Sequence, residues 1–102
     1  MSEKLSDNNF DEFINAHPLT LIDFYSDSCI PCKMISPLLS KAEVKYAGKV
    51  AFAKVNSAMN EKVIERYEIQ AAPTLVLIKD GEEVARHRGV ISADELDKLL
   101  DI

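Results

Sequence analysis

The chain has 102 residues, of which 47% are hydrophobic and 28% charged, and this balance indicates one globular domain, residues 1–102, with a single core. A formal net charge of −5 argues against a surface that binds the phosphates of nucleic acids, and no apolar run is long enough to cross a membrane. No N-terminal segment has the pattern of a secretory signal, so we expect a cytoplasmic protein.

The first half of the chain shows the pattern of a helix followed by a strand, a helix and a strand. Ser6-Asp7 is predicted to cap a short helix that ends at His17-Pro18. Residues 19–25 form a nearly continuous apolar run, which is typical of a strand buried on both faces. Residues 32–46 repeat apolar side chains at helical spacing, and residues 50–55 form a second β-type run. The strand, helix and strand predict a right-handed βαβ unit.

The second half of the chain predicts a helix, a hairpin and a final helix. Residues 61–67 have one apolar helical face, and the β-type runs 75–78 and 84–88 flank Asp80-Gly81, a dipeptide that closes antiparallel hairpins. Residues 92–95 read Ser-Ala-Asp-Glu, which is a capping box at the start of a helix. We therefore expect an α/β fold in which a mixed sheet lies between helices.

The only two cysteines lie three residues apart, in Cys29-Ile30-Pro31-Cys32, between the first apolar strand and the following helix. At a helix start they face the same way, and the partial positive charge of the backbone N–H groups favours a thiolate. Pro31 suits a first helical turn, and a disulfide closing so short a loop would constrain the unfolded chain little. The spacing thus indicates thiol–disulfide exchange. The alternatives are half a zinc site or a pair of inert buried thiols. The two histidines are isolated, so no metal is expected.

Asp23 is the one charged residue within its apolar strand. Burial drives an unpartnered carboxylate towards its protonated form, and such a group beside a nucleophile can move protons. The alternatives are a hydrogen-bonded structural carboxylate or an exposed edge position. Lys54 reads equally well as a solvated lysine at a strand end or as a cation that tunes a neighbour. Tyr25 reads as a packing residue.

Six short motifs, in order along nearly the whole chain, resemble the thioredoxin family. They are Leu21-Ile22-Asp23-Phe24, the run from Cys32 to Pro37, Lys54-Val55-Asn56, Ala72-Pro73-Thr74, the run from Lys79 to Glu82, and Gly89. The resemblance implies a thioredoxin fold, in which a mixed five-stranded sheet of order 1-3-2-4-5 is flanked by four helices. It also implies a first strand near Glu3 to Leu5 and a cis peptide bond between Ala72 and Pro73.

The resemblance further implies a protein disulfide reductase. Cys29 would attack a target disulfide and Cys32 would resolve the mixed disulfide. Asp23 would help to deprotonate Cys32, with Lys54 tuning the charge of Asp23. In the same family the segment equivalent to Ala72 and Pro73, together with the glycine equivalent to Gly89, lines the substrate groove.

By the same resemblance we expect a monomer that needs no cofactor beyond the cysteine pair. Its substrates would be disulfide-containing proteins, and an NADPH- or ferredoxin-linked thioredoxin reductase would restore the dithiol. The chain departs from the commonest family pattern because Ser28 and Ile30 replace Trp and Gly. We expect Ile30 and Pro31 to tune the redox potential. The alternative functions are a thioredoxin-fold binding subunit dedicated to one partner, or a disulfide oxidase or isomerase.

Overall fold

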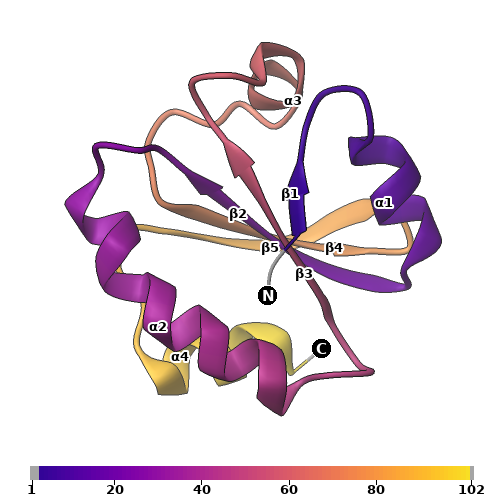
Figure 1. The fold of residues 1–102 in the computed structure, drawn as a ribbon. Helices are drawn as coiled ribbons and strands as arrows, with labels where there is room; N and C mark the ends of the chain where they lie inside the picture. The colour runs from indigo at the N-terminus through magenta and orange to yellow at the C-terminus, as the bar shows by residue number, and fades with distance from the viewer. Residues whose placement is uncertain (1–2, 102) are drawn as a thin grey trace.

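The computed structural model describes residues 3–101 and consists of a sheet with helices on both faces (Figure 1). The strands are β1 (Glu3–Leu5), β2 (Leu19–Tyr25), β3 (Ala51–Asn56), β4 (Thr74–Lys79) and β5 (Glu82–Arg88). The helices are α1 (Phe10–Ala16), α2 (Ile30–Lys45), α3 (Glu61–Arg66) and α4 (Ala93–Leu100). The predicted helices and strands are therefore present, with small shifts at their ends.

The strands lie in the order β1-β3-β2-β4-β5, which confirms the mixed sheet that the resemblance implies. β2 lies at the centre, parallel to β3 on one side and antiparallel to β4 on the other. In this register Asp23 of β2 is opposite Lys54 of β3 and opposite Leu75 of β4. Asp23 thus has a charged residue beside it on β3 and an apolar residue beside it on β4.

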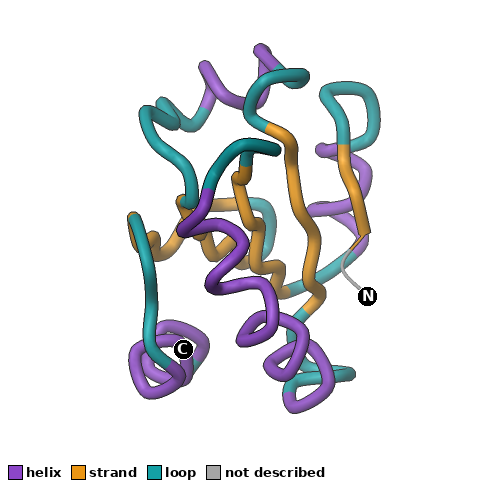
Figure 2. The backbone as a smooth tube through the Cα atoms, turned by 60° about the vertical axis from the view of Figure 1, so that its left-hand side comes forward, coloured by secondary structure: helices purple, strands orange, loops and turns teal. Residues whose placement is uncertain are grey.

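Each face of the sheet packs against its own pair of helices. One cluster joins α1 and α3 to the sheet, and its buried members include Phe10, Ile14, Ile22, Phe24 and Val63. The other joins α2 and α4 to the opposite face, and its buried members include Leu21, Ile35, Leu39, Leu77 and Leu96. Figure 2 shows α2 running along one face of the strands. Alternation along β2 sends successive side chains to opposite clusters, because neighbouring residues of a strand point to opposite faces.

Local sequence signals fix the ends of two elements as predicted. Asp80 and Gly81 connect β4 to β5 with φ values of 51° and 85°, the positive angles that a tight two-residue hairpin turn needs. Ser92 caps α4: its hydroxyl accepts a hydrogen bond from the backbone N–H of Glu95, and the Glu95 carboxylate accepts one from the N–H of Ser92. The capping box is therefore confirmed.

The predicted cap of the first helix is wrong. α1 begins after Asn9, with no side-chain hydrogen bond to its first turn. The carboxylate of Asp7 instead accepts hydrogen bonds from the backbone N–H groups of Lys62 and Val63, at 3.2 and 3.0 Å. Asp7 thus caps α3, a helix more than fifty residues further along the chain. A local pattern cannot reveal this pairing because it depends on how the chain folds back.

A polar contact joins the two helices on the other face. The Tyr46 hydroxyl donates a hydrogen bond to the carboxylate of Asp97 at 2.7 Å, and the Lys45 ammonium lies 3.0 Å from the same carboxylate. These contacts connect the end of α2 to α4 and therefore fix the far end of the helix that begins at the cysteines.

Candidate active site

The start of α2 positions the two cysteines. Cys29 is the N-cap residue, and its sulfur forms a disulfide bond with Cys32 and accepts a hydrogen bond from the Cys32 backbone N–H at 3.1 Å. Pro31 occupies the first turn, where its missing N–H breaks no helical hydrogen bond. Both cysteines are buried, whereas Ile30 between them is 72% exposed. The pair therefore lies at the rim of the fold, in the positive field of the helix N-terminus.

The Ala72-Pro73 segment lies against the disulfide. Its peptide bond is cis, as the resemblance implies, and the carbonyl oxygen of Ala72 is 3.5 Å from the Cys29 sulfur. The backbone N–H of Gly89 donates a hydrogen bond to the Pro73 carbonyl at 2.9 Å. Gly89 has a φ of 85°, which favours glycine. Residues distant in sequence thus form one backbone ledge beside Cys29.

Asp23 lies below the cysteines on β2. Its Oδ1 atom is buried and has no hydrogen-bond partner within residues 3–101. Burial raises the pKa of Asp23 from 3.8 to about 6, and the positive charge of Lys54 lowers it in part. Loss of solvation is the larger effect, since a buried carboxylate loses the water that stabilises its charge. The carboxyl group therefore titrates close to neutral pH.

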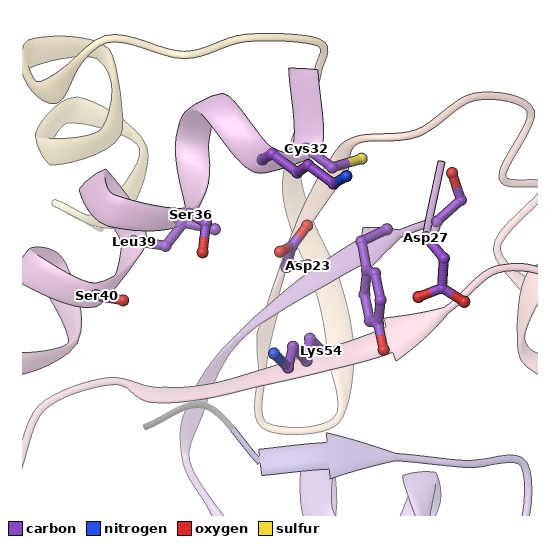
Figure 3. Close-up of a pocket in the computed structure, with 10 residues that line it drawn as sticks. Asp23, Asp27, Cys32, Ser36, Leu39, Ser40 and Lys54 are labelled. Atoms are coloured by element: carbon purple, nitrogen blue, oxygen red, sulfur yellow. The ribbon is translucent and has the colours of Figure 1, made fainter. Parts of the chain in front are cut away.

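A cavity of about 360 Å³ connects Asp23 with Cys32. In Figure 3, Asp23 lies between Cys32 on α2 and Lys54 on β3. The lining residues are Asp23, Tyr25, Ser26, Asp27, Cys32, Lys33, Ser36, Leu39, Ser40 and Lys54. Cys32 lines this cavity, whereas Cys29 faces the Ala72 carbonyl. The two sulfurs therefore have different surroundings, one beside a carboxyl group and the other beside a backbone ledge.

The fold brings the predicted site residues together around the disulfide, from four separate parts of the chain. The two histidines lie elsewhere: His17 bonds to the Phe13 carbonyl and His87 to the Val90 carbonyl. Within residues 3–101 no group of His, Cys, Asp and Glu is arranged to hold a metal ion. None of the helices in the described part of the chain has the length and apolar character needed to span a membrane.

Sequence reasoning missed several residues that line the cavity. Ser36 and Ser40 follow Cys32 at intervals of four, so helical spacing places all three on one face of α2. Tyr25 was assigned to packing, but alternation along β2 places it on the face of Asp23. Asp27, which lines the cavity, accepts a hydrogen bond from the Asn56 side chain at 3.2 Å. The periodicity of α2 and β2 is enough to find Ser36, Ser40 and Tyr25, whereas the Asp27 contact depends on the fold.

Comparison with known proteins gives consistent matches over nearly the whole chain. The family model described as Thioredoxin matches residues 1–102. The thioredoxin of Chlamydia pneumoniae is 41% identical over 103 residues, covering 99% of this chain and 97% of that protein. The thioredoxin of Staphylococcus haemolyticus is 37% identical over 98 residues, covering 96% of this chain and 93% of that protein.

A solved structure also matches the fold. The structure of Plasmodium falciparum thioredoxin aligns with a TM-score of 0.89 and 29% sequence identity, covering 97% of this chain and 96% of that chain. The match therefore includes the sheet, both layers of helices and the segments that surround the disulfide.

Proposed function

Because this chain belongs to the thioredoxin family and is a thiol–disulfide oxidoreductase, we propose that it acts as a protein disulfide reductase that supplies electrons to target proteins and maintains redox homeostasis. The observation that carries the proposal is the difference between the two sulfurs. Cys29 lies at the helix N-terminus beside the Ala72 carbonyl, whereas Cys32 lines the cavity that holds Asp23. A nucleophile beside a backbone ledge and a resolving thiol with its own base need this division.

The proposed cycle begins with the reduced pair. The Cys29 thiolate attacks one sulfur of a target disulfide, forming a mixed disulfide and releasing the other target sulfur as a thiolate, which takes a proton from water. Cys32 then gives its proton to the Asp23 carboxylate and attacks the Cys29 sulfur. This step releases the second target thiolate and leaves the Cys29–Cys32 disulfide. A pKa of about 6 supports the role of Asp23, since most of the carboxyl group is ionised at pH 7 and can accept the proton.

Lys54 is proposed to tune this base, because its positive charge favours the ionised form of Asp23. For substrate binding, we propose that an extended target segment pairs with the backbone of Ala72 beside Cys29, in the manner of an added strand. Pro73 and Gly89 would support this ledge through the hydrogen bond between them. Ile30 is proposed to meet the target directly, since its side chain is exposed beside the reacting sulfur.

The family implies disulfide-containing targets and a reductase that restores the dithiol. We propose a thioredoxin reductase linked to NADPH or to ferredoxin as the electron donor. A single domain acting as a monomer in the cytoplasm fits this role, because reducing compartments keep such cysteine pairs reduced.

The assignment of the two cysteines can be tested by trapping. Cys32→Ser leaves Cys29 free to attack but removes the thiol that resolves the product, so stable mixed disulfides with target proteins should accumulate. The matched variant Cys29→Ser should trap little, because its remaining thiol faces the Asp23 cavity and not the Ala72 ledge on which the target would bind. Mass spectrometry of the trapped species gives the linked cysteine, and equal trapping by both variants would contradict the assigned roles.

Reduction of insulin by the wild-type protein with dithiothreitol separates a reductase from a binding subunit. A binding subunit should give no turnover above background.

A further inference from the structure

The ammonium group of Lys54 lies over the ring of Tyr25. Its nitrogen is 5.6 Å from the ring centroid, within the range of a cation–π interaction. Among residues 3–101, Lys54 forms no ion pair with a carboxylate, although it acts on Asp23 electrostatically. The aromatic ring is therefore a contact that can hold this flexible side chain at the cavity.

The register of the sheet explains why these three side chains meet. Lys54 is directly opposite Asp23 across the β2–β3 pair, and Tyr25 is two residues beyond Asp23 on β2. Side chains two residues apart on a strand share a face, and a diagonal neighbour is within reach of an aromatic ring. All three are partly buried and line the same cavity. Tyr25 and Asp23 thus lie on the same face of β2, and Lys54 lies opposite Asp23 on β3.

We propose that Tyr25 is a positioning residue that holds the Lys54 ammonium beside the Asp23 carboxyl group. A lysine side chain has four rotatable bonds and ends in a strongly hydrated ammonium group. Without the ring, this ammonium group would extend into water. Its pull on Asp23 would then weaken, because the attraction between charges falls with distance and with solvent screening. The inference rests on the proposed role of Asp23 as the base in resolution.

The other charged or titratable groups that line the cavity are Asp27, Cys32 and Lys33. Cys32 carries no charge in the disulfide form. Lys33 and Asp27 are both exposed and have opposite charges, so solvent screens their effects on Asp23. In the oxidised protein neither cysteine titrates, so thiol ionisation does not affect the pKa of Asp23. Of the two lysines that line the cavity, Lys54 is then the one whose position should change that pKa.

The test is the pKa of Asp23, read from the ¹³C chemical shift of its carboxyl carbon during a pH titration of the oxidised protein. Tyr25→Leu should raise the pKa by roughly half a unit, and by no more than Lys54→Met raises it. Tyr25→Phe keeps the aromatic face and should leave the pKa unchanged. In a Lys54→Met background, Tyr25→Leu should have no further effect.

Two outcomes would overturn the proposal. An equal shift from Tyr25→Leu with and without Lys54 would mean that the ring acts by burial alone. A lowered pKa would mean that water enters the space left by the ring. If Tyr25→Leu fails to fold, a series of fluorinated phenylalanines at position 25 keeps the shape while weakening the cation–π interaction, and the pKa should then rise with each added fluorine. The titration is independent of turnover, so a failure of the reductase proposal would appear in the insulin assay and not here.

Discussion

At the scale of single residues, Asp23 makes a contribution to stability that depends on pH. Its pKa in the folded protein is about 6, above the ordinary value of 3.8, because burial disfavours the charged form. The folded protein therefore binds a proton more tightly than the unfolded chain does. This contribution to stability is complete below pH 3.8 and is lost as the pH rises through 6.

Replacing Asp23 with Asn should remove this pH dependence. Between pH 4 and pH 8 the free energy of unfolding of the wild type should fall by about 2.5 kcal/mol relative to Asp23→Asn, since each pKa unit corresponds to ~1.4 kcal/mol and part of the contribution is already lost at pH 4. Urea denaturation of the oxidised proteins at a series of pH values measures the difference. A constant difference across this range would show that the carboxyl group is not destabilised by burial. The same variant should slow resolution of a mixed disulfide more than the initial attack.

Ile30 is one of the two residues beside Cys29 that depart from the commonest family pattern, and it is exposed. A branched apolar side chain next to the sulfur reduces the solvation of a thiolate and so disfavours the reduced form. Ile30→Gly should therefore raise the redox potential, by on the order of 10–30 mV.

Equilibration with glutathione measures this potential. Ile30→Ala should give most of the same shift, which separates the loss of the side chain from the added backbone freedom of glycine. Met34→Ala is a suitable control because Met34 is exposed on the same helix but outside the Cys29–Cys32 loop. Equal potentials for wild type and Ile30→Gly would remove Ile30 from the residues that tune the pair.

At the scale of elements, the shortest helix depends on a distant cap. α3 has six residues, and its N-cap residue Asn60 forms no side-chain hydrogen bond to the first turn. The Asn60 side chain instead accepts a hydrogen bond from the backbone N–H of Asp7 at 3.1 Å, while the Asp7 carboxylate caps the helix. This reciprocal pair joins the segment after β1 to the start of α3, over the same face of the sheet.

Asp7→Ala should lower the free energy of unfolding by about 1–2 kcal/mol, the usual cost of losing a helix cap. The amide protons of α3 should also exchange faster, since the lost hydrogen bonds belong to its first turn. Asp11→Ala is the matched control: it removes an exposed ion pair with Arg66 on the same side of the molecule and should cost less than 1 kcal/mol. Equal losses from the two variants would mean that the cap contributes no more than a surface charge.

The elements themselves could be predicted from the sequence, because periodicity, the Asp80-Gly81 turn and the Ser92 capping box are local signals. The motif also indicated where Cys29 and Cys32 would lie. Their surroundings could not be predicted in the same way. The contact of Tyr25 with Lys54 and the cap that Asp7 provides depend on pairing between strands and loops distant in the chain, and no local pattern records such pairing.

At the scale of the whole molecule, the disulfide lies outside the two apolar clusters. The two apolar clusters fill both faces of the sheet, and neither includes a cysteine. The bond joins residues only three apart, so it restricts the unfolded chain less than a longer closure would. Both redox forms should therefore share one fold, as a carrier that cycles between them requires.

Reduction should lower the free energy of unfolding by about 2 kcal/mol, the loop entropy expected for so short a closure. Differential scanning calorimetry should show a melting temperature roughly 10 °C lower for the reduced protein. Circular dichroism at 25 °C should be the same for both forms. A Cys29→Ser, Cys32→Ser double variant should not respond to dithiothreitol, and a large loss of helix on reduction of the wild type would contradict this account.

The position of β2 in the sheet has a consequence for synthesis. This strand pairs on one side with residues 51–56 and on the other with residues 74–79, so both of its edges stay open until residues 51–56 are made, and one stays open until residues 74–79 follow. Cys29 and Cys32 emerge early, yet the ledge beside Cys29 and the lysine beside Asp23 follow much later. A nascent chain therefore carries the two thiols before Asp23 has its cation and before Cys29 has its ledge, and the complete site forms only when translation has delivered the rest of the sheet.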